Sequence, residues 1–152
     1  MDENENPLDR IDRKILAALT RDGRLSMAAL ADTVGLSKTP VQARVKKLEA
    51  GGFIKGYTAI LDHTKLGAGH VAFVQVSLTD TRSEALDAFS KAARETREIE
   101  ECHMIAGGYD YLLKVRTAHI AGFRRFLGET LSAMPHVSHT TTFVAMETVK
   151  ES

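Results

Sequence analysis

Two short helical patterns separated by a glycine turn constrain this chain more than any other feature of its sequence. The first pattern follows Ser26 and places apolar residues at helical spacing up to Val34. Gly35 can take the left-handed conformation that ends a helix. The second pattern runs from Ser37 to Leu48. Helix, short turn and helix is the helix-turn-helix arrangement, in which the second helix enters the major groove of DNA.

The second predicted helix has an apolar stripe and a basic face. Val41, Val45 and Leu48 lie at i, i+4 and i+7 and can seat the helix on a small core, while Ser37 is placed to cap its start. No carboxylate occurs between Lys38 and Leu48. A solvated charged face is the ordinary alternative for such a helix. With the preceding turn, however, the pattern predicts contacts with double-stranded DNA from Lys38, Thr39, Gln42, Ala43, Arg44, Lys46 and Lys47.

The charge of the chain is balanced overall but uneven along it. Residues 1–55 carry 10 Lys and Arg against 8 Asp and Glu, a net charge of +2. Residues 56–152 carry 10 against 12, a net charge of −2. DNA binding would therefore rest on the local cluster of the second helix and not on a general cationic field.

Length and composition disfavour several classes of protein. At 152 residues and 43% hydrophobic, the chain can bury two small cores. Its single cysteine, Cys102, allows no intrachain disulfide and has no second ligand pair at zinc spacing, so we expect no metal and no cofactor. Residues 1–6 are polar and acidic, unlike a signal peptide, and no apolar run reaches membrane-spanning length. We expect a cytoplasmic protein without a membrane partner.

Three segments of different character follow one another along the chain. Apolar residues from Leu8 to Leu19 recur at helical spacing and add a third helix to a DNA-binding domain over 7–55. Residues 53–62 are rich in β-branched and aromatic residues and predict an extended strand, which overlaps the linker strand expected over 56–66. Because a lone strand is unstable in water, we expect it to pair with another chain or with a wing of the same module. A second domain follows over 67–150.

The second domain alternates strands and helices. A capping box at Thr81–Glu84 predicts the start of its first helix. Strands are expected at residues 71–78, 99–106, 111–117 and 140–149. Helices are expected at residues 81–96 and 119–133. This βαββαβ order is the ferredoxin-like arrangement, in which helices cover one face of an antiparallel sheet, and the predicted fold class is α+β.

The other face of that sheet is predicted to need a cover. Val74 and Val76 alternate with Val71 and Phe73, so the first strand is apolar on both sides. A large exposed apolar face is a liability for a soluble protein. A second copy of the sheet is the economical cover, and we therefore expect a homodimer.

Several stretches of the sequence carry a resemblance to a known family. They include Leu8-Asp9-Arg10-Ile11-Asp12, Gly35-Leu36-Ser37, Arg44-Val45-Lys46-Lys47-Leu48-Glu49, Gly108-Tyr109-Asp110-Tyr111-Leu112-Leu113 and Thr142-Phe143-Val144-Ala145-Met146-Glu147. On these residues the chain resembles the leucine-responsive regulatory protein/AsnC family of prokaryotic transcription regulators, also called feast/famine regulators. Glu101-Cys102-His103 is more similar to its leucine-responsive members than to its asparagine-type members.

The resemblance implies an amino-acid-responsive regulator. It implies an N-terminal helix-turn-helix domain, a linker strand, and an effector domain whose dimers assemble into higher rings, often octamers. Free amino acids bind between dimers in that family. The pocket there combines groups of a neighbouring subunit with one loop, which in this sequence is Gly107, Gly108, Tyr109 and Asp110.

The chemistry of an amino-acid ligand suggests roles for individual groups. Asp110 could accept from the ammonium, and the loop amides with Thr140 or Thr142 could donate to the carboxylate. As a lone motif, the Gly-Gly-Tyr-Asp loop could equally be only a hairpin turn. Leucine is the first expected effector, while Pro135-His136 and His139 depart from the family pattern and leave proline or another amino acid open.

Two other functional classes compete with a specific regulator. Small ferredoxin-like dimers include enzymes, but the sequence shows no set of nucleophile, base and orienting residue and no paired carboxylates at a useful spacing. An architectural protein that wraps DNA with little sequence preference is the second alternative.

Overall fold

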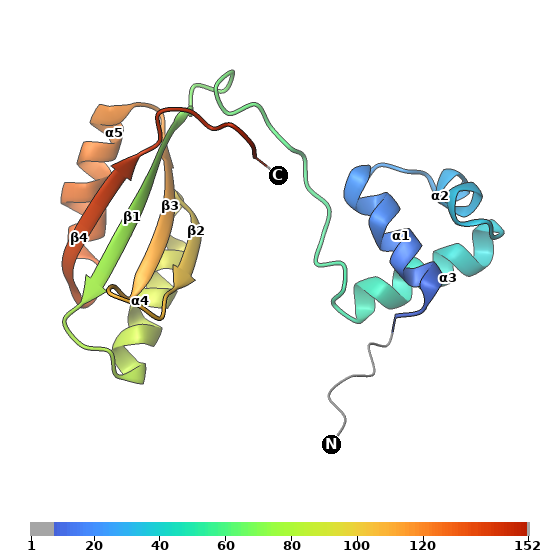
Figure 1. Ribbon diagram of the computed structural model, residues 1–152, viewed down its shortest axis with the longest axis horizontal. Helices are drawn as coiled ribbons and strands as arrows, with labels where there is room; N and C mark the ends of the chain where they lie inside the picture. Colours follow the sequence, from blue (N-terminus) through green and yellow to red (C-terminus); the bar gives the residue numbers. More distant parts are fainter. Residues whose placement is uncertain (1–7, 152) are drawn as a thin grey trace. The chain divides into compact units, whose positions relative to one another are not determined.

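The computed structural model describes residues 8–151 and contains two compact units, Met1–Ile60 and Leu61–Ser152 (Figure 1). Each unit has its own buried core and is described by itself. The finer limits at residues 7–55, 56–66 and 67–150 remain predictions.

The first unit consists of three helices around an aliphatic core. They are α1 (Arg10–Arg21), α2 (Met27–Val34) and α3 (Lys38–Ala50). The fully or almost fully buried side chains of this core are Ile15, Ala18, Leu30, Ala31, Val34, Val41, Val45 and Leu48. The helix-turn-helix prediction is confirmed, because α2 and α3 flank a turn in which Gly35 has a φ of 75°.

The three helices begin with different caps. Asp9 and Asp12 form a reciprocal capping box at the start of α1. The Ser26 hydroxyl accepts a hydrogen bond from the Ala29 N–H at 3.1 Å. Ser37 occupies the predicted cap position of α3, but its side chain makes no capping hydrogen bond.

Residues 53–62, predicted as a strand, form no strand in this chain. The N–H groups of Phe53 and Ile54 instead bond to the Leu48 carbonyl and close the end of α3. Tyr57 donates to Glu49 at 2.9 Å. Among the described residues no strand pairs with this segment, so of the two expected partners only another chain is pursued as a prediction.

The second unit has the predicted βαββαβ order. Its strands are β1 (His70–Leu78), β2 (Ile99–Met104), β3 (Tyr111–Thr117) and β4 (Val137–Val144). Its α-helices are α4 (Ser83–Glu95) and α5 (Ile120–Arg125). The sheet order is β2-β3-β1-β4 and every pairing is antiparallel. Both helices lie on the same face of the sheet (Figure 1), which confirms the ferredoxin-like α+β fold.

Several element boundaries differ from the predictions, including the end of β2 at Met104 and the start of β4 at Val137. The predicted capping box at Thr81 is wrong, because α4 starts at Ser83 and Asp80 instead binds Arg82 ahead of it. The helix after β3 changes type, since α5 continues as a π-helical turn (Phe126–Thr130) and a short 3-10 turn. β4 ends at Val144 and not near Val149, because β1, its pairing partner, begins at His70.

The two faces of the sheet have different compositions. Ala72, Val74 and Val76 are fully buried under the helices. On the opposite face Phe73 and Phe143 are 39% and 52% exposed and lie opposite each other on β1 and β4, and Phe73 also lies opposite Lys114 of β3. The open face is therefore a mixture of aromatic and charged groups, less uniformly apolar than the sequence suggested.

Candidate DNA interface and effector loop

Helix α3 presents one continuous polar face to solvent. Val41, Val45 and Leu48 are at most 5% exposed and hold the helix against α1 and α2. The exposed side chains are Lys38, Thr39, Gln42, Ala43, Lys46 and Lys47. None of these lysines forms an ion pair with another described residue. The structure thus brings six of the seven predicted DNA contacts onto one surface.

Arg44 is turned toward α1 instead. Its Nη1 lies 2.6 Å from Asp9 Oδ2 and 2.7 Å from Asp12 Oδ1. The hydrogen bond to Asp12, followed by that to Asp9, raises the pKa of the Arg44 guanidinium. The Asp12 backbone N–H and then Arg44 lower the pKa of the Asp9 carboxyl. Arg44 therefore ties α3 to α1, and we withdraw it from the predicted DNA contacts.

A second basic surface on α1 was missed by the sequence analysis. Arg10, Arg13, Lys14 and Arg21 are all exposed, and none has an ion pair within the part of the chain that the structure describes. Their signal was hidden because the acidic start of the chain was included in the charge count. Residues 8–55 alone carry 10 Lys and Arg against 5 Asp and Glu, a net charge of +5.

The predicted effector loop, Gly107–Asp110, joins β2 to β3, and Asp110 is its anchor. Asp110 Oδ2 accepts a hydrogen bond from the Leu78 N–H at 2.7 Å. The Asp110 N–H donates to the Val76 carbonyl at 2.9 Å, and its carbonyl accepts from Ile105 at 2.8 Å. The carboxylate thus satisfies the end of β1, where the pairing with β4 shifts register. Asp110 has a structural role whether or not it binds an effector.

The predicted ligand groups do not all meet within one chain. Thr140 and Thr142 lie opposite Val76 and Val74 of β1, while Tyr111, next to the loop, pairs with Val76 from the other side. Because β1 lies between them, the threonines and the loop are about 10 Å apart, two strand spacings. A complete pocket would require threonines, or other groups, from a neighbouring subunit.

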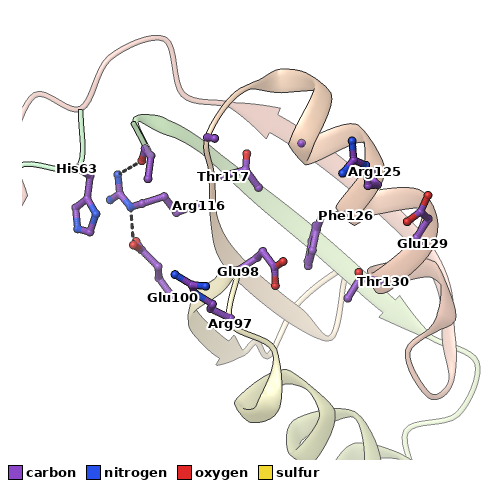
Figure 2. Close-up of a pocket in the computed structure, with 13 residues that line it drawn as sticks. His63, Arg97, Glu98, Glu100, Arg116, Thr117, Arg125, Phe126, Glu129 and Thr130 are labelled. Atoms are coloured by element: carbon purple, nitrogen blue, oxygen red, sulfur yellow. Dashed lines mark hydrogen bonds and ion pairs between the residues drawn. The ribbon is translucent and has the colours of Figure 1, made fainter. Parts of the chain in front are cut away.

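A cleft of about 490 Å³ lies at the opposite end of the sheet (Figure 2). One wall carries Arg97 and Glu98, from the connection between α4 and β2. The other wall carries Arg125 of α5 and Glu129 of the π-helical turn. Phe126 forms part of the floor and is 4% exposed. No motif in the sequence analysis pointed to this cleft.

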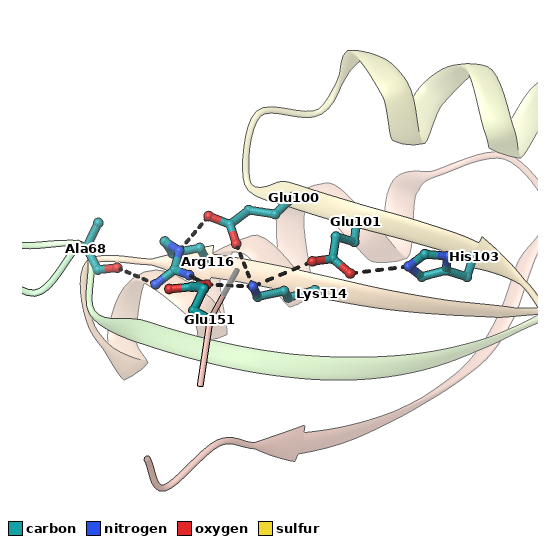
Figure 3. Close-up of polar contacts among 7 residues, drawn as sticks. All are labelled: Ala68, Glu100, Glu101, His103, Lys114, Arg116 and Glu151. Atoms are coloured by element: carbon teal, nitrogen blue, oxygen red, sulfur yellow. Dashed lines mark hydrogen bonds and ion pairs between the residues drawn. The ribbon is translucent and has the colours of Figure 1, made fainter. Parts of the chain in front are cut away.

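A chain of ion pairs crosses the open face of the sheet beside this cleft (Figure 3). Arg116 pairs with Glu100 and with Glu151 from the C-terminal segment. Lys114 lies 2.7 Å from the same Glu151 carboxylate. Burial raises the pKa of Glu100, but Arg116 and Lys114 together outweigh it and the net shift is downward. The hydrogen bond from Lys114 lowers the pKa of Glu151.

Family comparisons match both units. Residues 8–55 match the model described as winged helix-turn-helix DNA-binding, and residues 71–152 match the model described as Lrp/AsnC ligand binding domain. This chain belongs to the Lrp/AsnC family.

Curated Lrp/AsnC relatives cover almost the whole chain. The proline dehydrogenase transcriptional activator of Rhizobium radiobacter is 55% identical over 145 residues, which cover 95% of this chain and 93% of the relative. That of Rhodobacter capsulatus is 53% identical over 144 residues, with 95% and 94% covered. The leucine-responsive regulatory protein of Escherichia coli (strain K12) is 46% identical over 145 residues, with 95% and 88% covered.

Solved structures of the family have the same fold. A transcriptional regulator from Neisseria meningitidis, in complex with L-methionine, superposes with a TM-score of 0.88 at 30% identity, covering 95% of this chain and 93% of that one. The leucine response regulatory protein of Mycobacterium tuberculosis superposes with a TM-score of 0.83 at 30% identity, covering 95% of this chain and 96% of that one.

The comparisons decide between the functional classes. The chain is a DNA-binding transcription regulator of the Lrp/AsnC type, a class that responds to amino-acid ligands. Its relatives are regulators and not enzymes, so the enzyme alternative is set aside. Among residues 8–151, no helix has the length and apolar character needed to span a bilayer.

Proposed function

We propose that this Lrp/AsnC regulator binds specific DNA sites through α3, controls genes of amino-acid metabolism, and is modulated by a free amino acid at the 107–110 loop. The names of the two relatives at 55% and 53% identity favour a proline dehydrogenase gene as a target. L-proline is then the effector to test first, beside L-leucine, the first expectation from the sequence.

One observation carries the DNA-binding part of this proposal. Helix α3 buries a narrow apolar stripe. On the opposite face, three lysines and Gln42 are exposed and form no ion pair or side-chain hydrogen bond with any described residue. An amide such as that of Gln42 can read a base edge, and lysines bind phosphate. Gln42 and Lys46 lie four residues apart on the same face, as one groove-bound helix requires.

Substitution of Gln42 and Lys46 tests this interface. We expect Gln42→Ala to weaken binding to the selected site by about 1–3 kcal/mol and to leave random DNA unaffected. Lys46→Ala should weaken binding to both and reduce the salt slope of the affinity by about one unit. Fluorescence anisotropy over a salt series, on a site selected from random-sequence DNA, measures both effects. Lys91→Ala, at an exposed lysine of α4, is the matched control. Wild-type affinity in both α3 variants would exclude this helix.

The effector part of the proposal assigns Asp110 to the ligand ammonium. Its Oδ1 makes no hydrogen bond to any residue in the range 8–151, whereas Oδ2 is held by Leu78. Gly107 and Gly108 leave the adjacent backbone open to a ligand, and Tyr109 borders it. We propose that Thr140 and Thr142 of a neighbouring subunit meet the ligand carboxylate. The site would then form only in an assembly.

The Asp110→Asn variant separates binding from folding. Asparagine keeps an acceptor for the Leu78 N–H but removes the negative charge, whereas alanine would remove both. We expect Asp110→Asn to lose the amino-acid effect on operator binding, which for two coupled sites is typically about 1–3 kcal/mol or 5–150-fold in affinity. A thermal-shift panel of the twenty amino acids on the wild type identifies the ligand. An unchanged response in Asp110→Asn would move the site elsewhere.

We also propose a homodimer through the open sheet face and the segment Tyr57–Leu61, with octamers as the higher assembly. Exposed Phe73 and Phe143 on the open face, and exposed Tyr57, Ile60 and Leu61, supply the apolar contacts. A symmetric dimer would read half-sites about 34–36 Å apart, or a multiple of that spacing. A monomer at micromolar concentration in light scattering would contradict this assembly.

The basic face of α1 favours one second candidate, an architectural protein that wraps DNA with little sequence preference. Four cations on one helix, without ion pairs to any described residue, can bind phosphates whatever the base sequence. The ratio of affinities for the selected site and random DNA at one stated salt concentration decides between the two. A ratio near one would favour the architectural function.

A further inference from the structure

The cleft between α5 and the start of β2 is a candidate ligand site that neither the family resemblance nor the effector loop accounts for. Its volume of about 490 Å³ falls within the range of small-molecule sites. It lies at the end of β3 marked by Thr117, and its lining includes both Phe126 of the helix layer and Arg116 of the open face (Figure 2). One of its walls is a π-helical turn, an irregularity that recurs at functional sites.

The cleft walls present opposite charges in matched pairs. Arg97 and Glu98 stand on one wall and Arg125 and Glu129 on the other, with Phe126 between them in Figure 2. None of these four groups forms an ion pair within residues 8–151, in contrast to Arg116 beside them. Each wall can therefore offer one donor group and one acceptor group to a ligand.

The balance of charge in the cleft identifies the class of ligand. Two arginines and two glutamates of its lining make no ion pair to a described residue, and these are Arg97, Arg125, Glu98 and Glu129, whereas Arg116 and Glu100 pair with each other. A phosphate or dicarboxylate would be repelled by the glutamates as strongly as it was attracted by the arginines. A zwitterion meets both, since its carboxylate can bind an arginine and its ammonium a glutamate. Buried Phe126 supplies an apolar surface for an uncharged side chain.

We propose that this cleft is a second binding site for a free α-amino acid with an apolar side chain, with Arg97 and Arg125 binding the carboxylate and Glu98 and Glu129 the ammonium. The inference rests on the proposed amino-acid response of the chain. It concerns a site separate from the 107–110 loop, because Tyr111 and Thr117, at the two ends of β3, are about 20 Å apart at the usual rise per residue.

The position of the cleft connects it to the segment that precedes β1. His63 and Ala68 lie at its rim, and Arg116 Nη1 donates to the Ala68 carbonyl at 3.4 Å. A ligand in the cleft would order this segment through direct contact. Occupancy would thus affect the stretch of chain that leads to the DNA-binding unit, by a route independent of the effector loop.

Equilibrium dialysis with L-leucine and with L-proline tests the proposal on the full-length chain. We expect at least one of the two amino acids to bind the wild type at two molecules per chain. The double variant Arg97→Gln/Arg125→Gln should retain one class of site and weaken the other by roughly tenfold or more. Arg94→Gln/Arg124→Gln is the matched control, because both arginines are exposed, lie close in sequence to the substituted ones and do not line the cleft. It should bind as the wild type does.

The Asp110→Asn variant distinguishes failure of this inference from failure of the proposed effector site. If Asp110→Asn loses one class of site and the cleft variant loses the other, both proposals hold. A single class of site that survives in Arg97→Gln/Arg125→Gln overturns the cleft and leaves the loop in place. A single class that is lost only in the cleft variant supports the cleft and overturns the loop. Absence of binding by both amino acids overturns the cleft proposal.

Discussion

The cations of α3 and those of β3 have opposite surroundings. Lys46 and Lys47 of α3 project into solvent without ion pairs to any described residue. The side chains of Lys114 and Arg116 on β3 are only 15% and 8% exposed, and each contacts at least two carboxylates. Unpaired cations over an apolar stripe are available to an external anion, whereas paired cations stabilise the domain itself. Whether a cation forms ion pairs with carboxylates therefore indicates its role, in ligand binding or in stability, better than its residue type does.

The substitution Arg116→Ala should have the largest effect on stability of all the changes that test this comparison. It leaves Glu100 without its main partner and removes one of the two cations on the sheet that pair with Glu151. Breaking a fully buried pair costs about 3–5 kcal/mol, and partial exposure of the two carboxylates reduces the expected loss to roughly 2 kcal/mol. Calorimetry should show a lower transition temperature for the second unit and an unchanged transition for the helical unit. Equal shifts in both transitions would show that the units are coupled.

Acidification should produce a smaller loss in the same unit. The pKa values of Glu100 and Glu151 are lowered in the folded state, so their stabilising effect is fully present above the ordinary glutamate pKa of about 4.3. It is lost as the pH falls through the lowered folded-state values. Thermal unfolding between pH 6 and pH 3 measures this loss, with Arg116→Ala as the control, since that variant should lose less stability on acidification.

The substitution Arg44→Ala compares a paired with an unpaired cation on the same helix, α3. Arg44 is the paired cation of α3, and removing it leaves Asp12, 9% exposed, without its partner. We expect a loss in the stability of the helical unit, limited because the pair is partly exposed to solvent. The salt slope of DNA binding should stay unchanged, in contrast to Lys46→Ala. A slope reduced by one unit would return Arg44 to the DNA contacts.

The smallest expected effects concern the two helix caps. Ser26→Ala removes a capping hydrogen bond and should cost about 1 kcal/mol. Ser37→Ala removes none and should change stability by less than about 0.5 kcal/mol. Urea unfolding of the two variants compares them directly. A larger loss for Ser37→Ala would mean that its hydroxyl caps α3 in solution.

Sequence by itself determined the features that depend on local periodicity. Spacing along the chain predicts the apolar stripe of Val41, Val45 and Leu48, the turn at Gly35, and the order of strands and helices. The structure confirms all three features. The short motifs also identified the family, because such stretches are read without knowing their contacts. Element ends were less accurate, since capping at Thr81 and the length of β4 depend on neighbouring elements.

Only the tertiary structure decided which charged groups are available. Arg44 pairs with Asp9 and Asp12, which are more than thirty residues away in the sequence. Asp110, next to β3, accepts a hydrogen bond from Leu78 at the end of β1. The cleft of Arg97 and its neighbours likewise joins elements that are distant in the sequence. Spacing along a chain predicts which face a side chain occupies, but ion pairs and clefts form between elements, so their partners are fixed only when the chain packs.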